Sequence, residues 1–257
     1  MSTNNFSNNA SNIPNSNTES HIGQGLGDIV QPLVFSDNAR QELIQSLESI
    51  PKGLALTPVK NKRPLRSKWQ NESPLSRESL KSELSQERCN GYGLRLGDVS
   101  GGKLALDVDG PSAVSLLKAL ESTHEPLPKS VTFTSGKDGR SQILFQIPEH
   151  YRDRFKDFNR KSITEFFFNG ETLKCGTDEN GKPIEELDFR YNGHQSVLPP
   201  SYHPETGSYH WLNSPNDCEV AIAPDWLCEF ILKLSEPKKI QKNTPLKFEY
   251  STFEKGD

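Results

Sequence analysis

One short segment, residues 103–110, constrains the fold and the chemistry of this chain more than any other. It reads KLALDVDG, an apolar run that ends in Asp-x-Asp and a glycine. Because side chains alternate between the two faces of a β-strand, Asp107 and Asp109 project together while Val108 points the other way into a core. Two neighbouring carboxylates repel each other and are costly to desolvate unless a cation lies between them. The segment therefore predicts a strand that carries a pair of acids on one face.

Such a pair has two interpretations. Hard divalent cations prefer oxygen ligands, and paired carboxylates suit a two-metal site that aligns a phosphoryl displacement. Asp and Gly are also favoured at strand ends for reasons of turn geometry alone. Taken by itself, the segment is more typical of a turn or cap than of a metal site, and the rest of the chain changes that weighting.

Composition divides the 257 residues into three parts. Residues 1–34 are rich in Asn, Ser, Thr and Gly, which predicts a disordered tail. We expect a catalytic domain over residues 35–235, and the Lys, Pro and Glu of residues 236–257 indicate a linker or tail. No apolar run approaches the roughly 18 residues of a membrane helix, so we expect no membrane partner and a cytoplasmic location. Four scattered cysteines indicate reduced thiols and no zinc site.

Hydrophobic periodicity and capping residues predict interleaved helices and strands. Helices are expected over residues 36–47, 76–85, 112–121 and 224–232. Strands are expected over residues 54–59, 92–97, 103–109, 130–134, 142–147, 185–190 and 195–198. Two of the turns, at residues 100–102 and around Asn192-Gly193, are typical of hairpins. The pattern favours an α+β fold with a mixed or antiparallel sheet and flanking helices over a doubly wound parallel sheet.

Charge is unevenly distributed along the chain. The net charge of −4 excludes a generally cationic nucleic-acid binder. Residues 52–68 nevertheless contain six basic residues and no acidic one, and Trp69 follows directly. Lys60, Lys62 and Arg63 are candidates to follow a nucleic-acid backbone, with Trp69 stacking on a base. The alternative, a solvated basic loop beside a core tryptophan, is the more frequent meaning of such a pattern.

The order of these motifs resembles a known family. A Lys-Arg-Pro stretch ending in Trp69 is followed by Gly93–Gly97 (GLRLG), by the Asp-x-Asp-Gly segment, by Thr134-Ser135-Gly136 with Gly139-Arg140, by Leu187-Asp188-Phe189-Arg190, and by Leu198-Pro199-Pro200-Ser201 with His203. Together they resemble the N-terminal catalytic domain of bifunctional DNA primase/polymerases, in the archaeo-eukaryotic primase superfamily. The resemblance covers roughly residues 35–235.

The resemblance implies a core with an RNA-recognition-like sheet, a small second α/β unit, and a metal triad. Asp107 and Asp109 would be joined there by a third acid from a later strand, which falls on Asp188. Asp188 lies within an apolar alternation, where a lone charge needs a partner. Two alternatives stay open: Glu186 lies on the same face two residues earlier, and Asp188 can instead pair with Arg190.

One position departs from the family. Many members carry a Ser-x-His in which the His contacts the nucleotide phosphates, and this chain reads Arg140-Ser141-Gln142, so Gln142 takes the His position. Gln can donate to a phosphate oxygen but carries no charge, and Lys137 or Arg140 could supply one. The remaining nucleotide-binding candidates by resemblance are Arg95, Ser135, Arg190, Ser201 and His203.

The implied activity is that of a template-dependent nucleotidyltransferase that makes and extends primers, using Mg²⁺ or Mn²⁺ held by Asp107, Asp109 and Asp188. Its implied partners are a single-stranded DNA template, nucleoside triphosphates and a replicative helicase domain or partner, in plasmid, phage or other mobile-element replication. Two rivals remain. One is a non-catalytic replication module that keeps the fold, favoured by the missing His, and the other is a metal-dependent phosphohydrolase.

Overall fold

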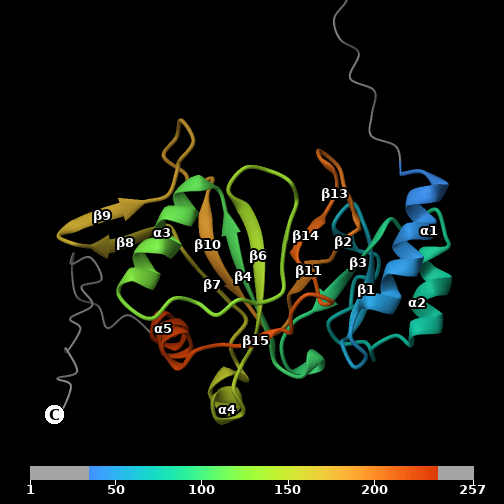
Figure 1. Ribbon diagram of the computed structural model, residues 1–257, viewed down its shortest axis with the longest axis horizontal. Coiled ribbons are helices and arrows are strands. Elements are labelled where there is room, and N and C mark those ends of the chain that lie inside the picture. Colours follow the sequence, from blue (N-terminus) through green and yellow to red (C-terminus); the bar gives the residue numbers. More distant parts are fainter. Residues whose placement is uncertain (1–34, 237–257) are drawn as a thin grey trace, which may run out of the picture. The chain divides into compact units, whose positions relative to one another are not determined.

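The computed structural model describes residues 35–236, which form an α+β domain with two main sheets (Figure 1). The predictions for residues 1–34 and for residues 237–257 lie outside the described part of the chain. Within the described residues, no helix is long and apolar enough to cross a membrane.

The larger sheet carries the Asp-x-Asp strand near its middle. Its strand order is β14-β5-β6-β4-β10-β7, and β15 pairs in parallel with β6. The bounds are β4 Lys103–Asp109, β5 Thr132–Thr134, β6 Arg140–Gln146, β7 Arg160–Ile163, β10 Glu186–Arg190, β14 His210–Asn213 and β15 Ala221–Ile222.

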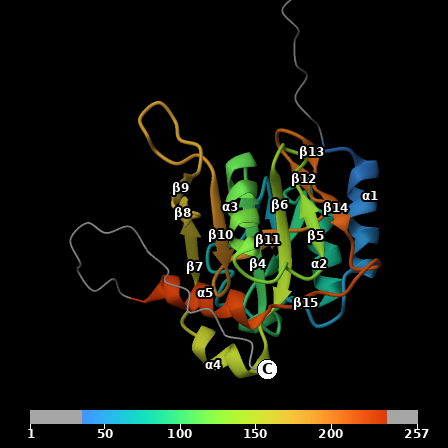
Figure 2. The ribbon, with the colours of Figure 1, turned by 60° about the vertical axis from the view of Figure 1, so that its left-hand side comes forward.

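Helices α3 (Pro111–Ser122) and α5 (Asp225–Ser235) cover one face of this sheet (Figure 2). Leu104, Leu106 and Val108 of β4 point into this layer, where they are at most 2% exposed. The alternation predicted from the sequence is therefore confirmed, because the acids of β4 share the opposite face. Pro111 opens α3 at a position where a missing N–H costs nothing. The short helix α4 (Arg152–Phe155) adds Phe155 to the same core.

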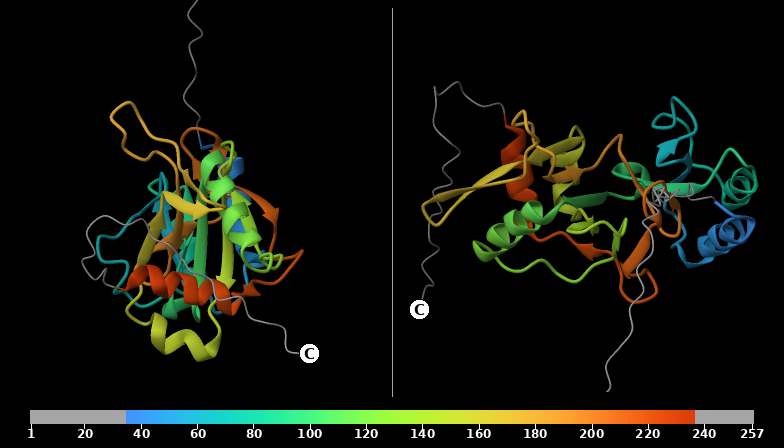
Figure 3. Two further views of the ribbon diagram at one scale, coloured as in Figure 1. Left: turned by 90° about the vertical axis from the view of Figure 1, so that its left-hand side faces the viewer. Right: turned by 90° about the horizontal axis from the view of Figure 1, so that it is seen from above.

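The smaller sheet has the order β11-β3-β1-β2 and packs against helices α1 and α2. Its strands are β1 Leu56–Lys60, β2 Arg63–Pro64, β3 Gly91–Arg95 and β11 Gln195–Val197, and the helices are α1 Asp37–Ser46 and α2 Arg77–Leu84. The predicted caps are confirmed: Ser36 accepts a hydrogen bond from Ala39 N at 3.2 Å, and Ser76 accepts one from Ser79 N at 3.1 Å. Seen from above, α1 and α2 lie at the opposite end from α3 and α5 (Figure 3).

The hairpin prediction at Asn192-Gly193 was wrong, and the one at residues 100–102 is confirmed only as a turn closed by a single antiparallel bridge. Strands β3 and β4 belong to different sheets and are joined through a 3-10 turn, Asp98–Ser100, with only the bridge between Gly97 and Lys103 linking them. Strands β10 and β11 likewise leave one sheet and enter the other around Asn192-Gly193. Turn residues mark a change of direction, but they do not reveal which strands pair across it. The two crossings join the sheets. A shared core that includes Leu94, Ala105, Leu144 and Leu198 lies between the two sheets.

Two small hairpins outside the main sheets were not predicted. One pairs β8 (Glu165–Phe168) with β9 (Glu171–Lys174), and the other pairs β12 (Tyr202–His203) with β13 (Gly207–Ser208). The β8–β9 pair is partly exposed, so its sequence lacks the clean alternation of a core strand.

Candidate active site

The acidic residues form two rows across neighbouring strands of the larger sheet. Asp107 on β4 lies directly opposite Asp188 on β10 and Gln142 on β6. Asp109 lies opposite Glu186 on β10 and Arg140 on β6. Residues paired across strands share a face of the sheet, so these six side chains gather on the face away from α3 and α5.

Arginines neutralise this cluster of carboxylates. Arg190 bridges two of them, with Nη2 at 2.5 Å from Asp107 Oδ2 and Nε at 2.5 Å from Asp188 Oδ2. Arg160 on β7 reaches Asp188 at 2.8 Å and Glu186 at 2.5 Å. A buried carboxylate needs such a partner, since an unpaired charge is strongly destabilising there.

Asp109 has a separate partner. Arg140 Nη1 lies 2.7 Å from Asp109 Oδ1, and both side chains are about one-third exposed. An ion pair this open to solvent is held only weakly. It can therefore be exchanged for another ligand more easily than the pairs of Asp188, whose side chain is fully buried.

Burial is the main influence on Asp107. The pKa of Asp107 is raised from 3.8 to about 6, chiefly by burial and also by the charges of Asp109 and Asp188, while Arg190 and a hydrogen bond from Gln142 act to lower it. The ionised form of Asp107 is thus costly as the site stands, and an added cation would relieve that cost.

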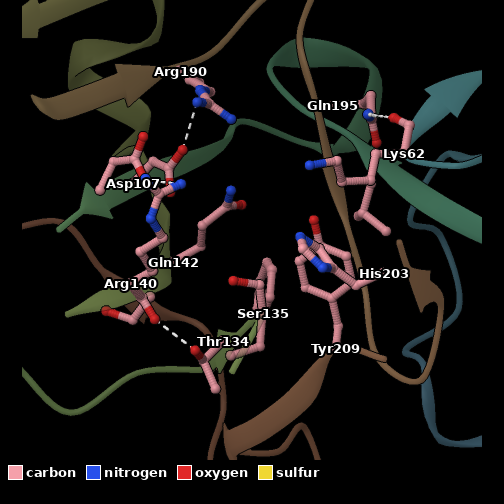
Figure 4. A pocket seen from close by; sticks show the side chains of 14 residues that line it. Lys62, Asp107, Thr134, Ser135, Arg140, Gln142, Arg190, Gln195, His203 and Tyr209 are labelled. Atoms are coloured by element: carbon pink, nitrogen blue, oxygen red, sulfur yellow. Dashed lines mark hydrogen bonds and ion pairs between the residues drawn. The ribbon is translucent and has the colours of Figure 1, made fainter. Parts of the chain in front are cut away.

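A cavity of about 300 Å³ opens over Asp107 and Asp109, between the two sheets (Figure 4). Figure 4 shows Asp107, Arg140 and Gln142 on one side and Lys62, Gln195 and His203 on the other. The full lining is Lys62, Asp107, Asp109, Phe133, Thr134, Ser135, Arg140, Ser141, Gln142, Arg190, Gln195, Val197, His203 and Tyr209. Acidic and basic groups converge on one space, as a polyphosphate substrate with bound cations requires.

A comparison with protein families decides the identity of this domain. The family described as "Bifunctional DNA primase/polymerase, N-terminal" matches residues 46–226. The chain belongs to this family. No curated protein matches the chain. The primase/polymerase match spans both sheets and includes every residue that lines the cavity.

The cavity of this primase/polymerase domain brings together eight of the residues singled out in the sequence. They are Lys62, Asp107, Asp109, Ser135, Arg140, Gln142, Arg190 and His203. The structure does not place Arg95, Lys137, Asp188, Ser201, Lys60, Arg63 or Trp69 in the lining.

Arg95 and Ser201 both bond to backbone, Arg95 to the loop between β2 and α2 and Ser201 to strand β3. The Arg95 guanidinium, 5% exposed as a residue, donates to the carbonyls of Gln70 and Glu72, both at 2.8 Å. Ser201 Oγ accepts from Tyr92 N at 3.0 Å and donates to Tyr92 O at 3.2 Å. Such bonds to backbone groups are common for Ser side chains.

Two lysines outside the lining have partners of their own. Lys137 forms an ion pair with Glu205, and Lys60 Nζ donates to the carbonyl of Glu87 at 2.7 Å. His203, in contrast, faces the cavity from β12 and is 3% exposed, and its Nδ1 accepts from Thr206 N at 3.2 Å. Burial lowers the pKa of His203, and the charge of Lys62 lowers it further, so its ring is neutral at pH 7.

Sequence reasoning missed Tyr209, Gln195 and Phe133, which also line the cavity. Tyr209 packs edge to face on His203 with ring centroids 5.3 Å apart. Phe133 on β5 lies opposite Gln142 on β6. Its place on the acid-bearing face therefore depends on how the two strands pair, and no sequence motif indicates it. Gln195 belongs to the other sheet, and no local signal in its sequence points to this space.

The donor chemistry of the site fits a divalent cation. Asp107 and Asp109 offer hard oxygen ligands toward the cavity. In the described residues no group of three or more His, Cys, Asp or Glu side chains is already arranged to hold a metal ion. Arg190 lies between Asp107 and Asp188 and forms an ion pair with each.

Proposed function

We propose that this domain is a template-dependent nucleotidyltransferase, a DNA primase/polymerase that makes primers and extends them. The observation that carries the proposal is the cavity of about 300 Å³ that Asp107 and Asp109 line together with Lys62, Arg140 and Arg190. Family membership supports the same activity. Nucleoside triphosphates and a single-stranded DNA template would be its substrates.

Asp107 and Asp109 would hold Mg²⁺ or Mn²⁺, and Asp188 would complete the set as the third ligand. When bound, these divalent ions would neutralise the negative charge of the triphosphate and of the departing pyrophosphate, and they would favour ionisation of the 3′-hydroxyl. The raised pKa of Asp107 supports a cation at this place, since burial makes its isolated negative charge costly. Arg190 would keep the acids apart and neutralised until the cations enter.

The other cavity residues would bind and orient the nucleotide. Ser135 and Gln142 offer neutral donors, and Arg140 brings charge on the same side as Asp109. Tyr209 and Phe133 would supply the aromatic part of the cavity wall.

The wider assignment rests on the family. The larger sheet with α3 and α5 would be the RNA-recognition-like core, and the smaller sheet the second α/β unit. The template strand would be contacted by Lys60, Arg63 and Trp69. These residues lie close in sequence to Lys62, which lines the cavity. Replication of a plasmid, phage or other mobile element, with a helicase domain or partner, is the setting that the family suggests.

A second candidate is a nucleotide- or DNA-binding module without catalysis. Two observations favour it: a neutral Gln142 stands at the histidine position, and Asp107, Asp109, Asp188 and Glu186 each have an arginine partner. Three arginines thus offset most of the charge of these four acids without metal.

The deciding experiment incubates the protein with single-stranded template, labelled nucleotides and Mn²⁺, with and without a primer. We expect extension of the primer and new short products without it, and neither with Asp107→Asn. Binding of template and nucleotide without any product would support the non-catalytic module, and release of phosphate or cleavage of the template would support the hydrolase.

A further inference from the structure

The tight turn between β1 and β2 keeps a lysine where the backbone favours glycine. Asn61 and Lys62 are the only residues between the paired ends Lys60 and Arg63, and their φ angles are 48° and 71°. Two-residue turns with positive φ at both positions strongly prefer Asn-Gly. Asn61 fits that preference and Lys62 does not, because a side chain there is strained.

Two amide side chains fix this turn in place. Asn90 accepts from Asn61 N and donates to Asn61 Oδ1, both at 2.8 Å, and it is 3% exposed. Gln195 donates from Nε2 to the carbonyl of Lys62 at 3.1 Å. The backbone of Lys62 is therefore held at the rim of the cavity, and its position does not depend on the side chain.

Lys62 differs from the other cations around the cavity in having no carboxylate partner among the described residues. Arg140 is paired with Asp109, Arg190 with Asp107 and Asp188, and Lys137 with Glu205. Lys62 lines the cavity on the side opposite the acids (Figure 4). Its ammonium group is the positive charge that this part of the molecule leaves open to a ligand.

Gln142 and His203, which line the cavity on opposite sides (Figure 4), carry no charge at neutral pH. Gln142 donates to Asp107, and its buried Oε1 has no hydrogen-bond partner in the described part of the chain. His203 has a lowered pKa, caused first by burial and then by Lys62 itself. A ligand with several negative charges would therefore bind the ammonium group of Lys62, unpaired among the described residues.

We propose that Lys62 binds the phosphates of the incoming nucleoside triphosphate from the smaller sheet, supplying the charge that Gln142 lacks. This rests on the proposed function and alters one detail of the sequence interpretation, which gave Lys62 to the template. A nucleotide held between Lys62 and the acids of β4 bridges the two sheets. The strain of the turn persists because glycine, which fits the backbone, offers no ammonium group.

The test uses Lys62→Gly, a substitution that the backbone of the turn favours, so the variant keeps its fold. Binding of dATP, ATP and adenosine is measured by titration calorimetry with Mn²⁺, and binding of a single-stranded oligonucleotide by fluorescence anisotropy. Loss of one charge-assisted phosphate contact weakens dATP and ATP binding roughly 10- to 100-fold. We expect that loss, with adenosine and oligonucleotide affinities changed less than about twofold, and with partial recovery in Lys62→Arg.

Lys118→Ala is the matched control, because it removes one exposed lysine charge from α3 on the far side of the larger sheet. Weakened oligonucleotide binding with unchanged triphosphate binding in Lys62→Gly would overturn the proposal and return Lys62 to the template. Absence of triphosphate binding to the wild type would overturn it as well. Triphosphate binding that depends on Lys62 in a protein that makes no primers would sustain this inference and refute the polymerase assignment.

Discussion

The substitution Asp107→Asn should raise the stability of the metal-free protein at alkaline pH. Burial raises the pKa of Asp107 from 3.8 to about 6, and its side chain is only 13% exposed. Because this pKa is raised in the native state, protonation stabilises the fold fully below pH 3.8, and that stabilisation is lost as the pH rises through about 6. A shift of this size corresponds to about 3 kcal/mol in the free energy of unfolding.

Asparagine has nearly the same shape and cannot ionise, so the variant escapes this cost. Urea unfolding of both proteins in EDTA, from pH 4.5 to pH 8, gives the difference between them at each pH. We expect the difference to move by about 2 kcal/mol in favour of Asp107→Asn across this range, because part of the full effect is already lost at pH 4.5. The exposed Asp138 provides the control, and Asp138→Asn should give a difference that stays flat. A constant difference for Asp107→Asn, or one that moves toward the wild type, would mean that the pair with Arg190 outweighs burial.

Three further changes test other parts of the site. Arg95→Ala should lower the free energy of unfolding by about 1–3 kcal/mol and leave the KM for nucleotide unchanged; a raised KM would place Arg95 in substrate binding after all. Gln142→His should lower the KM for nucleotide a few-fold below pH 7, where the imidazolium forms stronger phosphate bonds; kinetics identical to the wild type at pH 6 would count against phosphates at this position. Saturating Mn²⁺, at about 100 times its Kd, should stabilise the wild type and Glu186→Gln by about 2.7 kcal/mol but not Asp188→Asn; thermal shifts in the reverse order would exchange the two acids.

Local sequence signals predicted the elements of this fold better than their pairing. Ser36 and Ser76 mark helix starts because a cap is a contact within one turn of chain. The alternation of residues 103–109 predicted the shared face of Asp107 and Asp109 for a similar reason. The pairing of β10 with β4 and of β11 with β3 depends on contacts between distant segments, so the turn at Asn192-Gly193 was misread as a hairpin.

The same distinction holds for the site. The motif residues Asp107, Asp109, Gln142 and His203 were predicted to face one space, and they do line one cavity. The ion pair of Asp188 with Arg160 could not be predicted, because only the pairing of β7 with β10 places Arg160 beside the site.

The most direct test of the central claim is primer synthesis on a single-stranded template with Mn²⁺ and labelled nucleotides. Wild-type protein should make and extend primers, and Asp107→Asn and Asp109→Asn should make none while folding normally. Synthesis by either variant at the wild-type rate would contradict the assignment of β4 as the metal-binding strand. A wild type that binds nucleotide and template but forms no product would contradict the nucleotidyltransferase itself.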